Sequence, residues 1–66
     1  MNIPKAILKE WGELREPEDV QELERIANVS HVTVRKAFNA GKCNERVFKA
    51  ISGFYRERKK LLEWNK

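Results

Sequence analysis

The sequence predicts an all-α fold, a small bundle of about four helices that ends in a long C-terminal helix. Apolar residues recur at intervals of three and four along most of the chain, as they do on one face of a helix. Between these stretches stand residues that start or stop helices, chiefly Pro, Asn, Ser and Gly. No stretch keeps the alternation of a half-buried strand. With 66 residues, the chain has room for one domain, residues 1–66.

The first two helices are expected on either side of Pro17. Pro4 suits a first helical position, and one apolar face accompanies it, made of Ile3, Ile7, Trp11 and Leu14. Pro17 disfavours a helical residue before it but can itself open a helix, so the second helix should begin near this residue. Glu18 and Asp19 would then stabilise the helix dipole. The apolar face of this helix consists of Val20, Leu23 and Ala27.

The third helix is expected over residues 31–40. Asn28 tolerates the left-handed backbone of a tight turn, Ser30 can cap the helix that follows, and Gly41 is a natural stop. The inward face would hold Val34, Ala37 and Phe38. The β-branched residues at 29 and 32–34 could argue for a strand, but the apolar positions do not alternate.

The last helix should cover about residues 44–64, with Asn44 as its cap. Its inner side is formed by Val47, Ile51, Phe54 and Tyr55. A basic run follows, and then three apolar residues: Leu61, Leu62 and Trp64. These three either fold back to complete a thin core or pair with a second subunit in a homodimer, and the sequence leaves both open.

Composition narrows the classes of function. One Cys and one His allow no internal disulfide and no zinc cluster, so no metal or other cofactor is expected. Paired carboxylates, a nucleophile with a base and a phosphate-binding glycine loop are missing, which argues against an enzyme. No apolar run approaches the roughly 20 residues that span a bilayer, and acidic residues occupy the place of a signal peptide's apolar stretch. We therefore expect a cytoplasmic protein, nucleoid-associated or in a host cytoplasm, with no membrane partner.

Charge is divided unevenly along the chain. Residues 1–24 carry 3 basic and 7 acidic side chains, a net charge of −4. Residues 25–66 carry 11 basic and 3 acidic side chains, a net charge of +8. This division suggests that the C-terminal two thirds faces a polyanion, although two solvated faces of a soluble protein would also explain it.

Two short helices joined by about three residues, the second of them capped by Ser, form a helix-turn-helix, here at about residues 18–40. Residues 23–39, LERIANVSHVTVRKAFN, resemble the DNA-binding headpiece of the lactose-repressor family. The shared positions are Ala27, Val29, Ser30, Thr33, Val34 and Asn39. The additional N-terminal helix makes the overall layout closer to phage repressors of the Cro and lambda type.

The resemblance implies sequence-specific binding to double-stranded DNA by a small phage or prokaryotic transcriptional regulator, a repressor. It implies base reading by His31, Val32 and Lys36, with Arg35 and Asn39 close by. Ser30 and Thr33 would contact phosphates, and the DNA backbone would be clamped by Lys42, Arg46 and Lys49. Core packing is the alternative for Val32, and an ordinary solvated surface is the alternative for the charged residues.

One departure from the family pattern bears on packing. The family's small Ala in the first motif helix is Glu24 here, at a position that usually faces the partner helix. A buried carboxylate there would need an ion pair with Arg25, Arg35 or another neighbouring base.

The alternative function is a small helical interaction adaptor of a phage packaging or recombination complex, whose acidic N-terminal third docks a basic partner.

Overall fold

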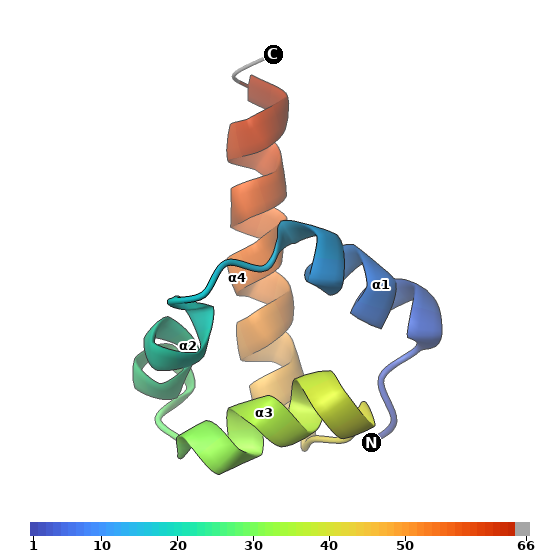
Figure 1. Ribbon diagram of the computed structural model, residues 1–66, viewed down its shortest axis with the longest axis vertical. Helices are drawn as coiled ribbons and strands as arrows, with labels where there is room; N and C mark the ends of the chain where they lie inside the picture. Colours follow the sequence, from blue (N-terminus) through green and yellow to red (C-terminus); the bar gives the residue numbers. More distant parts are fainter. Residues whose placement is uncertain (65–66) are drawn as a thin grey trace.

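The computed structural model describes residues 1–64 and contains four helices (Figure 1). They are α1 (Lys5–Leu14), α2 (Asp19–Ala27), α3 (His31–Ala40) and α4 (Glu45–Trp64). The predicted all-α bundle with a long last helix is therefore confirmed. Within the described residues, the only β-type pairing is an isolated antiparallel bridge between Asn2 and Lys42.

The long helix α4 organises the molecule. In Figure 1, α1 and α2 lie on its two sides, α3 crosses its N-terminal end, and its last turns project beyond the other helices. The molecule measures 34 × 24 × 19 Å along its principal axes. The outer face of α3 and the free end of α4 are thus at opposite ends of the long axis.

The core lies where all four helices meet, and the predicted apolar faces supply it. Its buried members include Trp11, Leu23, Val34, Ala37, Val47, Ile51 and Tyr55. The Trp11 and Tyr55 rings are stacked, with centroids 6.0 Å apart, and Trp11 meets Phe38 edge to face at 6.1 Å. Aromatic side chains give a chain of this length much of the apolar burial that its stability requires.

The helix boundaries follow the predicted signals closely. Asn28 has φ 54° and Gly41 has φ 67°, both in the left-handed region, and Ser30 and Asn44 accept hydrogen bonds from the amides of Thr33 and Val47. The second helix begins at Asp19, two residues after Pro17. The helix begins slightly later than the expected start near Pro17 because residues 17 and 18 form a turn. In this turn the Asp19 amide donates to the Glu16 carbonyl oxygen at 3.1 Å.

The structure decides three points: the place of the C-terminal apolar residues, the role of Asp19 and the burial of Glu24. Leu61, Leu62 and Trp64 do not fold back, because α4 continues straight past the core and leaves them 61%, 52% and 86% exposed. Asp19 does more than stabilise a helix dipole: it is 2% exposed, and its carboxylate is bound by side chains of α4. Glu24 is only half-buried, so its carboxylate does not require an ion pair; Arg25 pairs with Glu22 instead, and the basic side chain near Glu24 is His31.

Candidate nucleic-acid interface

The turn between α2 and α3 is short, and backbone and side-chain caps close it at both ends. It contains three residues, 28–30. The left-handed Asn28 directs its own amide and that of Val29 back to the Glu24 carbonyl oxygen, which closes the end of α2. Ser30 is extended, with ψ 160°, and its hydroxyl accepts from the Thr33 amide at 3.4 Å, which opens α3.

Two contacts hold α3 itself, and a third joins the neighbouring helices α2 and α4. Val34 and Ala37 are fully buried in the core, so the inner face of α3 is held by packing. The Arg46 guanidinium, from the first turn of α4, donates to the Ala27 carbonyl oxygen at the end of α2. The guanidinium of Arg15 lies over the Phe38 ring, 4.4 Å from its centroid. The inner face of α3 is therefore held by core packing and by the Arg15–Phe38 contact.

The opposite face of α3 is free of internal contacts with the core. Val32, Lys36 and Asn39 follow one another at intervals of four and three, so they form one stripe, on the side of the helix away from Val34 and Ala37. All three are exposed, and Val32 has 62% of its surface open to solvent. The alternative that Val32 packs in the core is therefore wrong.

His31 and Arg35 lie along one edge of this stripe and are also exposed. The Nδ1 atom of His31 lies 3.9 Å from a carboxylate oxygen of Glu24, close enough for an ion pair when the imidazole is protonated. Within residues 1–64, Arg35 and Lys36 form no ion pair, so their charges are available to an external partner.

A hollow of about 570 Å³ adjoins the outer face of α3. Its lining includes Asn2, Val32, Thr33, Lys36, Lys42 and Asn44. The N-terminal segment forms one wall because the Ile3 amide donates to the Gly41 carbonyl oxygen at 2.7 Å and the Cys43 amide donates to the Met1 carbonyl oxygen at 3.2 Å. Two ammonium groups, two amides and a hydroxyl thus line one concavity, a set of donors that suits phosphate oxygens.

The predicted phosphate-binding residues divide into three groups. Lys42 lies beside the outward stripe of α3, in the hollow with Lys36. Ser30 and Thr33 bond to each other through their hydroxyls at 3.3 Å, as parts of the helix cap. The Arg46 guanidinium donates to the Ala27 carbonyl oxygen of α2. Lys49 pairs with Glu45 at 3.2 Å and lines a different groove, between α2 and α4. The structure therefore brings Lys42 to the candidate site but not Lys49.

Sequence reasoning missed Asn2. Its place beside Lys42 depends on backbone pairing between segments about 40 residues apart, and no local pattern signals such pairing. A short apolar anchor, the buried Ile3, is the feature that holds this segment in place.

No helix among residues 1–64 is long and apolar enough to cross a membrane, and no three metal-ligating side chains gather in that part of the chain. Comparisons with protein-family models, with curated proteins and with solved structures find no match to this chain.

Proposed function

We propose that the protein binds double-stranded DNA in a sequence-dependent manner, with α3 in the major groove. The observation that carries the proposal is the exposed stripe of Val32, Lys36 and Asn39 on a helix whose other face is fully anchored. An α-helix with its side chains is about 10–12 Å across and fits a major groove about 12 Å wide. A firmly held helix keeps its side chains in register with base edges.

Each outward side chain has a chemical counterpart in that groove. Lys36 and Arg35 can donate to guanine O6 and N7, and Val32 can contact a thymine methyl group. Asn39 and His31 can bond to base edges or to phosphates. Lys42 and Asn2, from the adjoining hollow, would contact the DNA backbone and set the register of α3.

The biological role that fits is a small phage or prokaryotic transcriptional regulator, most simply a repressor that occupies its operator at the nucleoid or in a host cytoplasm. Regulators with this motif commonly bind as dimers. The three residues at which the sequence predicted subunit pairing, Leu61, Leu62 and Trp64, are all exposed.

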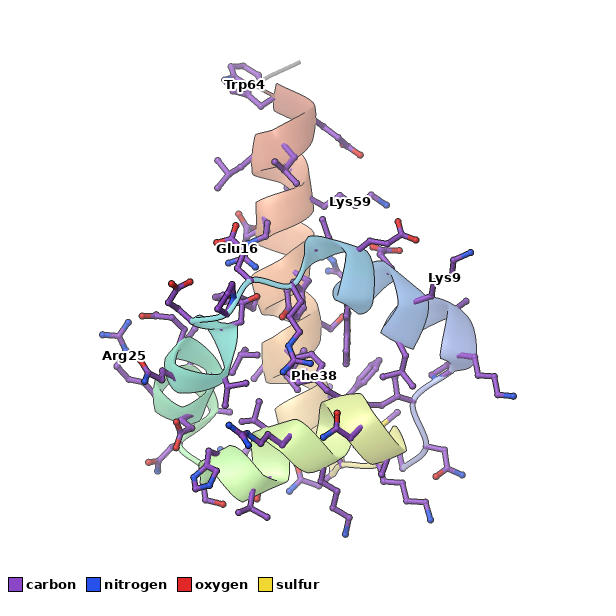
Figure 2. All side chains as sticks on the ribbon, viewed as in Figure 1. Lys9, Glu16, Arg25, Phe38, Lys59 and Trp64 are labelled. Carbon is purple, nitrogen blue, oxygen red and sulfur yellow. The ribbon has the colours of Figure 1, made fainter. Side chains whose placement is uncertain are left out.

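Selection of bound duplexes from a random pool tests the proposal, followed by fluorescence anisotropy titrations of the enriched duplex and a scrambled one. Lys36→Ala should relax the sequence preference by about 1–3 kcal/mol at one base pair. Lys42→Ala should weaken binding to both duplexes alike. Lys9→Ala is the control, since Figure 2 shows Lys9 projecting from α1, away from α3. If no sequence is enriched, or if duplex binding is absent at physiological salt, the adaptor role becomes the better hypothesis.

A further inference from the structure

An apolar groove runs between α2 and α4, on a part of the molecule that the proposed DNA contact leaves unused. Its lining includes Ile26, Ala50, Gly53, Phe54, Glu57 and Leu61. Two of these residues, Ala50 and Gly53, have little or no side chain and so leave space in the groove. A Cβ added at Gly53 would meet nothing within 4 Å. The groove can therefore accept a bulky apolar side chain from outside.

Such a side chain stands on the same face of α4. Phe54, Leu61 and Trp64 follow a spacing of seven and three residues, which keeps them on one side of the helix. Trp64 is 86% exposed at the free end of α4 (Figure 2). It lies ten residues beyond Phe54, which corresponds to roughly 15 Å along a helix. One surface thus carries both a large protrusion and a hollow.

We propose that two copies of this chain pair antiparallel along α4, so that Trp64 of each copy occupies the α2–α4 groove of the other. A two-fold interface brings one patch against itself and must be self-complementary. With the two-fold axis at the level of residue 59 along α4, on the side of the helix that carries the groove, Trp64 of one copy lies opposite Phe54 of the second copy. Trp64 of each copy then enters the α2–α4 groove of the other, so the same contact forms twice.

Charge also favours the antiparallel arrangement. A parallel pairing would place Glu57 against its own copy, and like charges that face each other across an interface are unfavourable. In the antiparallel pairing Glu57 lies opposite Leu61 and beside Lys60 of the second copy. Glu57 and Lys60 already lie 3.8 Å apart within one copy, so the pairing forms an alternating cluster of opposite charges at the two-fold axis.

The available area fits a second copy that associates reversibly. Ile26, Leu61 and Trp64 are 51%, 61% and 86% exposed. Together they offer on the order of 400 Å² of apolar surface, about half of the ~800 Å² that each partner buries in a standard interface. We therefore expect a dimer that forms at micromolar or higher concentration and dissociates on dilution. Leu62 is also exposed, but it lies about 100° from Leu61 around the helix, so we place it outside the contact.

The arrangement gives the dimer a particular geometry. In each copy α3 crosses the N-terminal end of α4, so antiparallel pairing puts the two α3 faces at opposite ends of the dimer, pointing outward. Such a dimer would hold two duplex segments, and it therefore differs from the usual dimers of helix-turn-helix regulators, which occupy adjacent half-sites of one duplex. This consequence rests on the proposed function, whereas the pairing itself does not.

Sedimentation equilibrium of the full chain without DNA tests the pairing. Gly53→Leu fills the groove at a position with free space, and Trp64→Ala removes the protrusion from a solvent-exposed site; each should weaken association at least tenfold. Gly12→Leu is the matched control, since Gly12 is also helical and exposed with nothing within 4 Å of an added Cβ. It should leave association unchanged. A chain that is monomeric up to millimolar concentration, or association insensitive to Gly53→Leu and Trp64→Ala, would overturn the pairing.

Disulfide trapping determines the orientation. In a Cys43→Ser background, a chain with Glu57→Cys is mixed with a chain with Leu61→Cys. Antiparallel pairing brings these two positions together, so the mixed disulfide should dominate after mild oxidation. Predominance of the two symmetric disulfides would show a parallel dimer and overturn the proposal.

DNA experiments separate this inference from the proposed function. Gly53→Leu should bind one duplex as well as the unmodified chain does but fail to retain a second, labelled duplex on an immobilised one. If association follows the expected pattern but no duplex is bound, the proposed function fails and the pairing stands. If one duplex is bound and the unmodified dimer never retains a second, the bridging geometry is wrong.

Discussion

Arg58 in α4 holds the carboxylate of Asp19 at the first residue of α2, 39 positions earlier in the chain. Both guanidinium Nη atoms donate to the carboxylate, with Nη2 to Oδ1 at 2.9 Å. The same carboxylate accepts from the Tyr55 hydroxyl at 2.8 Å and the Glu16 amide at 2.9 Å. Nη1 also donates to the Leu14 carbonyl oxygen at 3.0 Å. One ion pair thus joins the end of α1, the start of α2 and the middle of α4.

Removing either partner should destabilise the fold, but unequally. Arg58→Met leaves a carboxylate that is 2% exposed without its counter-charge, so we expect a loss of about 3–5 kcal/mol in the free energy of unfolding. Asp19→Asn leaves a guanidinium whose side chain is 21% exposed and can be hydrated, so the loss should be smaller. Urea unfolding followed by circular dichroism measures both. Equal losses would show that solvent access of Arg58 does not matter.

The pair should also make stability depend on pH in the acid range. Burial alone would raise the pKa of Asp19, but hydrogen bonds from Arg58, the Glu16 amide and Tyr55, with the charge of Arg58, hold that pKa below its usual value. The stabilisation is therefore complete above the unfolded pKa of about 3.9 and is lost as pH falls through the lower folded pKa. The difference in unfolding free energy between the unmodified chain and Asp19→Asn should shrink as pH falls from 6 to about 2. A constant difference over that range would contradict this linkage.

The stability of the turn between α2 and α3 should depend on the backbone conformation of Asn28. Asn28→Ala puts a residue without a locally bonding side chain at φ 54° and should cost about 1 kcal/mol in unfolding free energy. Asn28→Gly relieves the left-handed strain and should be neutral within about 0.5 kcal/mol. Thermal unfolding of the two variants compares them directly. If both lower the melting temperature equally, the Asn28 side chain, and not the backbone, matters at this position.

Substitution of Lys42 should affect duplex binding, whereas substitution of Arg46 should affect stability. Lys42 lies in the hollow beside α3 without an ion pair among residues 1–64, so Lys42→Ala should leave stability unchanged and reduce the salt dependence of duplex binding by about one ion. Arg46 donates to the Ala27 carbonyl oxygen, so Arg46→Ala should lower the unfolding free energy by about 1 kcal/mol. Paired unfolding and anisotropy measurements on the two variants give both quantities. A stability loss with Lys42→Ala would show that this residue has a structural role.

The local features of the molecule could be inferred from short stretches of sequence. Asn28, Ser30, Gly41 and Asn44 each act on backbone groups within four residues, so their roles as caps and turns depend on residue type and spacing alone. The apolar periodicity that predicted the buried faces works for the same reason. The outward stripe on α3 follows from it, because the residues opposite a buried face must be exposed.

Contacts between residues far apart in the sequence could not be inferred, because they depend on how the helices pack against one another. Asp19 and Arg58, or Asn2 and Lys42, carry no mutual spacing rule, and only the packing of α1, α2 and α4 brings them together. The sequence by itself determined the helices, their caps and the face of α3 that meets solvent, through interactions within one helical turn. The tertiary structure alone decided that Asp19 is buried, that Lys49 lies away from the candidate interface and that the end of α4 projects, since each depends on contacts between separate helices.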